Sequence, residues 1–185
     1  MILVKDKGLR IKDDSGFTLI EVIVYLALFA ILFGGAIAAA YNVIESSGRN
    51  QTKANLQEEG EFLVAKINWA LSGVQIVSIP AVGSESSQLS VSKVTGLYNG
   101  LPIIVYLSVR LDGTNMVIDK GIGPVVSVVL NNSNNYVSQL VFTHASASGQ
   151  GINPESASAR FVLSAKTPGG MDMSQEFSTT AFLRK

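Results

Sequence analysis

One carboxylate, Glu21, lies inside a stretch of apolar residues that contains no other charge. Within residues 17–44 it is the only charged side chain. A carboxylate inside a membrane segment costs about 2.5–3.5 kcal/mol at mid-helix, and less near a helix end. Because no basic residue lies nearby in the apolar run, its partner must come from another molecule or from a newly created charge. Glu21 is therefore the first candidate functional residue.

The remaining polar residues form no catalytic or metal-binding motif. A Ser-His-Asp site would need the single histidine, His144, which is expected at the surface or at a strand end. The absence of cysteine excludes disulfides and cysteine nucleophiles. Asp112, Asp119 and Asp172 are scattered, so a calcium site would require loops that meet in space. We expect no enzyme activity, no cofactor and no metal.

The element that carries Glu21 is predicted to be a membrane-spanning helix. Residues 22–41 contain no charge, and a helix of this length covers about 30 Å, the thickness of a bilayer's hydrocarbon core. Basic residues are more numerous before this stretch than after it (Lys5, Lys7, Arg10 and Lys12 against Arg49 and Lys53). This bias places the N-terminus in the cytoplasm and the C-terminal part outside.

The residues around Glu21 resemble the processing motif of type IV prepilins and type II secretion pseudopilins. The similar residues follow a short charged leader and precede the apolar helix: Ser15, Gly16, Phe17, Thr18, Leu19, Ile20 and Glu21. The resemblance implies that a membrane peptidase cuts after Gly16 and that the new terminal residue, Phe17, is N-methylated. It also implies that Glu21 is the family's glutamate at the fifth mature position.

Cleavage behind Gly16 would expose an amine on Phe17, and glycine lets the backbone fit closely into a protease groove. Glu21 can then pair with the positive terminus of a neighbouring subunit inside an apolar filament core. Desolvation offsets the attraction, whereas an unpaired buried charge costs several kcal/mol, so the pair sets axial register more than strength. The predicted subunit-assembly residues are Phe17, Thr18, Leu19 and Glu21.

Other interpretations of the N-terminus stay open. A plain single-pass anchor, such as a monomeric adhesin, gives Glu21 no role. An ordinary secretory signal would be cut near Ala38, Ala39 and Ala40 and would release an exported binding or hydrolytic β-domain. The apolar stretch is longer than the usual signal core of about 7–15 residues, and an acid lies near its start. Both features favour the prepilin interpretation.

Gly34 and Gly35 lie in the middle of the membrane segment. Glycine is common in membrane helices, but Gly35 and Ala39 also form a small-residue pair suited to close helix packing. A local unwinding point during filament growth is a further alternative. Ala38 stands where many major pilins carry a helix-bending proline, and this departure favours a minor pilin or a J-type pseudopilin.

The helix is predicted to continue to about residue 71, loosened around Ser46-Ser47-Gly48. Glu45 and Arg49 are spaced for an ion pair one turn apart, and Trp69 is expected in the core or in a helix–sheet contact. An apolar stripe of helical period is expected to face a sheet: Leu56, Leu63, Ile67, Ala70 and Val74.

After Ser72 the period changes to two, which predicts an antiparallel β-rich head domain. Turns are expected at Asp112-Gly113 and Pro168-Gly169-Gly170, and exposed loops at 131–135 and 146–158. The expected strands are 74–79, 89–94, 103–111, 115–119, 125–130, 137–144, 160–166 and 176–183. The fold class is thus α+β, with a removed leader (1–16), a spine helix (17–72, membrane half 17–44) and a head (73–185).

These features predict a non-enzymatic subunit of a type IV pilus, type II secretion or competence-type filament. Its expected partners are other pilin or pseudopilin subunits, a prepilin peptidase/N-methyltransferase, membrane lipid before assembly, and an inner-membrane assembly platform. That platform needs a separate ATPase, because the chain has no phosphate-binding loop. The zero net charge gives no indication of nucleic-acid binding. Before assembly the chain is expected in the inner membrane, and afterwards in an extracytoplasmic or cell-surface filament.

Overall fold

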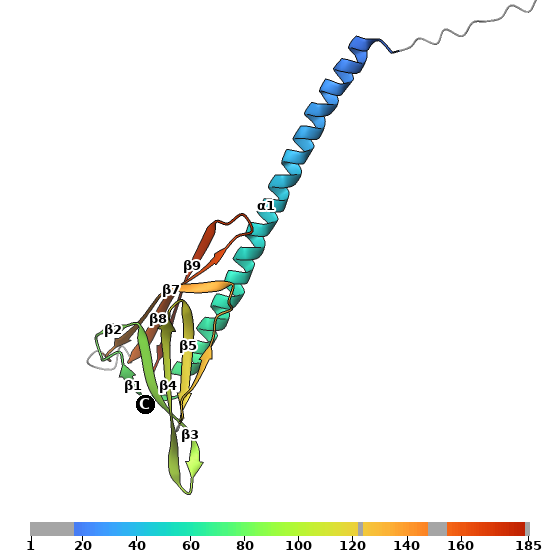
Figure 1. The fold of residues 1–185 in the computed structure, drawn as a ribbon. Coiled ribbons are helices and arrows are strands. Elements are labelled where there is room, and N and C mark those ends of the chain that lie inside the picture. The colour runs from blue at the N-terminus through green and yellow to red at the C-terminus, as the bar shows by residue number, and fades with distance from the viewer. Residues whose placement is uncertain (1–16, 122–123, 148–154, 184–185) are drawn as a thin grey trace, which may run out of the picture. The chain divides into compact units, whose positions relative to one another are not determined.

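The computed structural model describes residues 17–121, 124–147 and 155–183. The predicted leader, including Gly16, lies outside the described residues. The chain divides into two compact units, which we describe separately: Met1–Ile44, the N-terminal unit, and Glu45–Lys185, the C-terminal unit. The fold class is α+β, as predicted, with one long helix and antiparallel sheets (Figure 1).

Helix α1 (Leu19–Leu71) contributes residues to both units. It begins two residues later than predicted, because Thr18 acts as its N-cap. The expected loosening around Ser46-Ser47-Gly48 is wrong, since the helix is continuous there. The predicted pair of Arg49 and Glu45 is confirmed, with Nη2 and Oε1 2.6 Å apart.

Two antiparallel sheets make up most of the C-terminal unit. One has the order β1-β3-β4-β5-β6 and the other β2-β7-β8-β9 (Figure 1). The strands are β1 (Val74–Ile79), β2 (Glu85–Ser86), β3 (Gln88–Tyr98), β4 (Leu101–Asp112), β5 (Asn115–Gly121), β6 (Val126–Val129), β7 (Asn135–Ala145), β8 (Ser156–Lys166) and β9 (Asp172–Phe182).

All eight predicted strands are present, and β1 has the predicted bounds. The short strand β2 was not predicted, because two residues are too few to show a period. The predicted loop 146–158 is too long, since Ser156 already belongs to β8. The turn at Asp112-Gly113 is confirmed: Asp112 pairs with Asn115, and Gly113 has a φ of 61°.

The core combines one face of α1 with residues of both sheets. The predicted stripe is confirmed, because Leu56, Leu63, Ile67, Ala70 and Val74 are all buried. Gly60, which the sequence did not single out, completes this face. A Cβ at Gly60 would lie only 2.0 Å from Cζ of Phe177, so the phenylalanine ring fills the space that a side chain would need.

The prediction that residues 131–135 form an exposed loop is wrong for two of its members. Asn131 and Asn135 are buried. The Oδ1 atom of Asn131 accepts the backbone N–H of Met116 at 2.7 Å, and its Nδ2 donates to the carbonyl of Asn135 at 2.9 Å. These bonds compensate the amide for its lost water, which allows a polar side chain to be buried.

His144 lies near the end of β7, as predicted, but it is buried and not at the surface. Its Nδ1 is 3.1 Å from the carbonyl oxygen of Pro80, and its Nε2 is 2.8 Å from Oε1 of Glu155. Trp69 forms the expected helix–sheet contact but is half-exposed. The Lys93 ammonium on β3 lies 4.8 Å from its ring centroid and donates to its carbonyl.

Candidate assembly site at the start of the helix

The first turn of α1 is organised by Thr18. Its Oγ1 accepts the backbone N–H of Glu21 at 3.3 Å, and its carbonyl accepts the N–H of Val22 at 3.2 Å. A threonine N-cap followed three residues later by glutamate is the capping-box spacing. The negative carboxylate of Glu21 also lies where the helix dipole is positive. The residue types therefore explain why the helix begins here.

Tyr25 is a neighbour of Glu21 that the sequence analysis missed. Its hydroxyl donates to Oε1 of Glu21 at 3.1 Å, one turn further along the helix. Its ring also meets that of Phe17 edge-on, with centroids 6.3 Å apart. The i,i+4 spacing of Glu21 and Tyr25 was the available signal. Tyr25 supplies a neutral donor only, and residues 17–44 contain no lysine or arginine.

The predicted assembly residues thus lie together at one helix end. Thr18 and Glu21 share a hydrogen bond, and Tyr25 links Glu21 to the ring of Phe17. The side chains of Phe17 and Leu19 are exposed. This end of the helix therefore presents an apolar surface with one carboxylate in it.

Gly34 and Gly35 lie within the unbroken helix, so no unwinding occurs at them in this structure. A Cβ at either position would meet no other atom within 4 Å. Among the described residues, α1 is the one helix long and apolar enough to cross a membrane, and the most apolar part of it is not buried. The two glycines leave room for a second helix, and their packing role stays a prediction.

A comparison with protein-family models decides the nature of this N-terminus. The model for the prokaryotic N-terminal methylation motif matches residues 11–37. The chain carries the type IV pilin and pseudopilin signature. The matched residues include the predicted cleavage position Gly16, the acid Glu21 and both membrane glycines. A search of curated proteins and a search of solved structures give no match.

The signature implies a processing route and a class of partner. It implies cleavage by a prepilin peptidase and assembly with other pilin subunits. Together with the apolar helix, it fits a membrane-anchored pilin before assembly.

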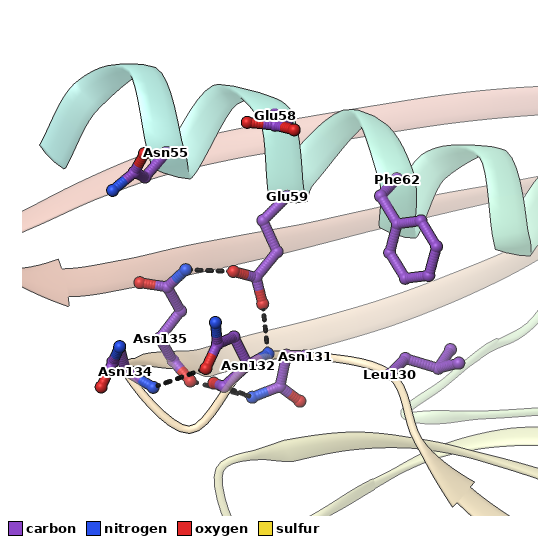
Figure 2. Close-up of a pocket in the computed structure, with 9 residues that line it drawn as sticks. All are labelled: Asn55, Glu58, Glu59, Phe62, Leu130, Asn131, Asn132, Asn134 and Asn135. Atoms are coloured by element: carbon purple, nitrogen blue, oxygen red, sulfur yellow. Dashed lines mark hydrogen bonds between the residues drawn. The ribbon is translucent and has the colours of Figure 1, made fainter. Parts of the chain in front are cut away.

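A polar recess in the C-terminal unit lies between α1 and the segment after β6 (Figure 2). The carboxylate of Glu59 accepts hydrogen bonds from the backbone N–H of Asn132 and the side-chain amide of Asn135. These bonds join helix and loop. Among the described residues, no group of three or more His, Cys, Asp or Glu side chains could hold a metal ion.

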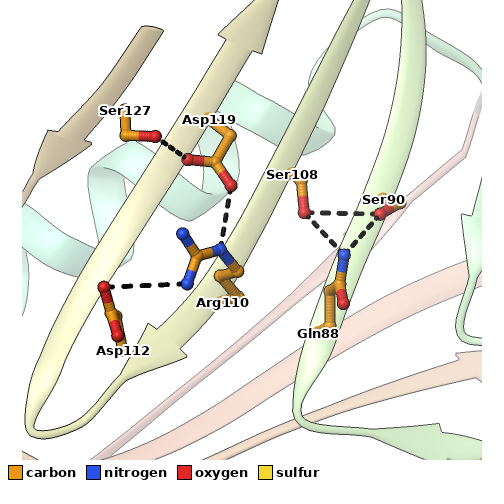
Figure 3. A network of polar contacts seen from close by, with 7 residues as sticks. All are labelled: Gln88, Ser90, Ser108, Arg110, Asp112, Asp119 and Ser127. Carbon is orange, nitrogen blue, oxygen red and sulfur yellow. Dashed lines mark hydrogen bonds and ion pairs between the residues drawn. The ribbon is translucent and has the colours of Figure 1, made fainter. Parts of the chain in front are cut away.

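A second polar cluster lies on the five-stranded sheet (Figure 3). The carboxylate of Asp119 accepts from Ser127 Oγ at 2.6 Å and from Arg110 Nε at 2.9 Å. The pKa of Asp119 is held below its ordinary value, chiefly by the hydrogen bond from the Ser127 hydroxyl. Burial opposes this shift, and the hydrogen bond and charge of the Arg110 guanidinium add to it. Every buried side-chain nitrogen or oxygen among the described residues has a partner.

Proposed function

We propose that this pilin-type chain is a minor pilin or J-type pseudopilin. It is a subunit of a type IV pilus, type II secretion or competence-type filament and enters it after cleavage behind Gly16. The observation that carries the proposal is the methylation-motif match over residues 11–37. The departure at Ala38 from the proline of many major pilins supports the minor role.

Glu21 pairs in the filament with the amine that cleavage creates on Phe17 of a neighbouring subunit. Two features support this pairing. Among the described residues the carboxylate accepts a hydrogen bond from the neutral donor Tyr25, and residues 17–44 carry no other charge. Inside an apolar bundle an unpaired carboxylate costs several kcal/mol. A subunit that is displaced along the axis loses the pair, so Glu21 selects the correct stagger.

Gly34 and Gly35 permit a neighbouring helix to approach the backbone of α1 in the middle of the membrane or filament core. The support is the empty space around both positions within the single chain. Small residues at helix interfaces let backbones come close, and van der Waals packing then stabilises association where the hydrophobic effect cannot.

The proposed subunit is not an enzyme and binds no cofactor. Its partners are other pilins, the prepilin peptidase/N-methyltransferase, and an inner-membrane platform driven by a separate ATPase. Before assembly α1 lies in membrane lipid, with the N-terminus inside the cell. After assembly the C-terminal unit lies on an extracytoplasmic or cell-surface filament.

N-terminal sequencing and mass spectrometry of the native protein test this function. We expect the mature chain to begin at N-methylated Phe17, and we expect a Gly16→Leu variant to retain residues 1–16. A mature chain that begins near Tyr41 would instead identify an exported β-domain released by an ordinary signal peptidase. Native protein that keeps its first sixteen residues would overturn the proposal.

A further inference from the structure

Strands β3 and β4 continue beyond the rest of their sheet as a two-stranded hairpin (Figure 1). Strand β1 pairs with β3 no further than Lys93, and β5 pairs with β4 only from Tyr106 onward. Among the described strands, residues 94–104 therefore pair only with one another. We call residues 94–104 the β3–β4 arm. Its five β3 residues correspond to a reach of roughly 16 Å.

Pairing within the arm continues to its tip, with one register shift between Val94 and Gly96. Tyr98 pairs with Leu101, and the two residues between them, Asn99 and Gly100, have φ angles of 50° and 81°. Positive φ at both central residues is the requirement of a type I′ turn, whose twist matches that of the flanking strands. The turn chemistry therefore matches a tight two-residue hairpin at the tip.

The arm presents apolar and aromatic side chains to solvent without any charge. Leu97, Tyr98 and Leu101 are 72%, 69% and 71% exposed. No charged residue occurs between Lys93 and Arg110. An isolated two-stranded hairpin is marginally stable in water, and exposed apolar edges promote unwanted pairing unless a partner covers them. Tyrosine enrichment and charge depletion are typical of the buried centre of a protein–protein interface.

We propose that the β3–β4 arm docks on the head of the neighbouring pilin-type subunit in the filament. This inference rests on the proposed function, because assembly through α1 brings the heads of successive subunits beside one another. A lipid surface is disfavoured, since membrane-binding segments carry lysine or arginine beside their apolar residues. The arm contains neither, and Lys93 at its base is engaged with Trp69.

The head of this chain shows that the fold can provide a suitable receptor. An apolar recess of about 580 Å³ lies beside Trp69, with Ile118, Val126, Val128 and Leu130 among its lining residues. An apolar arm on one surface and an apolar recess on another form a head-to-tail contact. Contacts of this kind generate open helical assemblies when the rotation between successive subunits does not close into a ring.

Photo-crosslinking in native filaments tests the arm. A benzoylphenylalanine replaces Tyr98 in one variant and Thr180, an exposed residue on β9, in the control. We expect the Tyr98 position to crosslink to the head of a chain that itself carries the methylation motif, as identified by mass spectrometry. Crosslinks to lipid or to non-pilin proteins only, or equal pilin crosslinking from Thr180, would overturn the inference.

Charge substitution provides a second measurement. We expect Tyr98→Lys and Leu101→Lys to lower the amount of the chain in filaments about tenfold, as loss of an interface hot spot does, whereas Thr180→Lys leaves it unchanged. Processing at Phe17 should be normal in all three, and so should the unfolding midpoint, because both arm positions are exposed. Unchanged incorporation of the arm variants would refute docking.

The two proposals fail in different ways. A wild-type chain that is not cut before Phe17, or is not found in filaments, refutes the proposed function. Suppose instead that the wild-type chain is processed and incorporated. If Tyr98 then gives no pilin crosslink and the arm lysine variants are incorporated as well as Thr180→Lys, only the docking of the arm is refuted.

Discussion

Glu21 has two roles that a single substitution can separate. It belongs to the first turn of α1, where Thr18 and Tyr25 contact it, and it carries the charge proposed to meet a neighbour's amine. Glutamine keeps an acceptor for Tyr25 but removes the charge. We therefore expect Glu21→Gln to insert into the membrane and to be processed normally, yet to fall at least tenfold in filaments, measured by immunoblot of sheared filament fractions.

Tyr25→Phe is the matched control for this experiment. It removes the internal hydrogen bond and leaves the carboxylate charged, so we expect incorporation close to that of the unaltered chain. If Glu21→Gln assembles normally while Tyr25→Phe does not, the contacts within the subunit matter and the intermolecular pair does not exist.

Asp119 should make the stability of the protein depend on pH in the acid range. Because its pKa is lowered in the folded state, its contribution is present above the unfolded value of about 3.9. The contribution is lost as the pH falls through the lower folded pKa. We expect Asp119→Asn to reduce the free energy of unfolding at neutral pH by about 1 kcal/mol, a small effect because the partner Arg110 is partly exposed and screened.

The measurement is urea unfolding in detergent, followed by circular dichroism from pH 7 down to about pH 2.5. The variant should lose less stability than the unaltered protein as the pH falls below about 4. Ser127→Ala, which removes the first cause of the shift, should give an intermediate result. Parallel curves for all three proteins would show that Asp119 does not contribute.

At the scale of elements, the close approach of α1 and β9 depends on Gly60. Alanine there gains about 1 kcal/mol of helix propensity but overpacks the core at a cost of about 1–3 kcal/mol. The ring of Phe177 has little room to move, because it is buried and stacks on Phe161 at 5.4 Å. The overpacking cost therefore lies at the upper end of this range, and after the propensity gain we expect Gly60→Ala to destabilise the protein by about 2 kcal/mol in urea unfolding.

Gly48→Ala is the control, since its Cβ would lie 3.1 Å from the side chain of Pro168, which needs to move only slightly. It gains the same helix propensity of about 1 kcal/mol and loses part of it to the shift of Pro168, so it should not destabilise the protein. Adding Phe177→Leu to Gly60→Ala should restore part of the lost stability. A Gly60→Ala protein as stable as the unaltered one would mean that α1 and β9 do not pack this closely.

The elements themselves could largely be predicted from local pattern. The stripe from Leu56 to Val74 and the strand β1 were visible because period and flanking turn residues lie within a few positions of one another. The burial of Asn131 could not be predicted in this way, because its partner Met116 lies on β5, fifteen positions away. Gly60 was missed for the same reason: the ring that requires it comes from β9. Long-range partners leave no local signal.

At the scale of the whole molecule, all of the core residues lie in the C-terminal unit. The buried hydrophobic residues begin at Leu56, and the most apolar part of α1 is unburied. We therefore expect a fragment of residues 45–185 to fold alone, to stay in solution without detergent at low concentration, and to unfold within a few degrees of the full chain. A fragment whose circular dichroism spectrum shows little helix and little sheet would contradict this expectation.

The candidate assembly site was the most predictable part of the molecule, because its chemistry is contiguous. Gly16, Phe17 and Glu21 are read directly from the sequence, and the family match covers all three. The cap by Thr18 and the bond from Tyr25 were equally local. By contrast, the β3–β4 arm depends on where neighbouring strands stop pairing, which no single segment of sequence contains.

The order of strands within the two sheets has a consequence for how the molecule is made. Strands β4, β5 and β6 each pair with the strand directly before them in the chain, and so do β8 and β9. Hairpins of this kind close over short separations and form early. Each can therefore form as soon as its second strand is available, from the N-terminal side onward. The pairing of β2 with β7 spans a much longer stretch and must wait until most of the polypeptide has emerged.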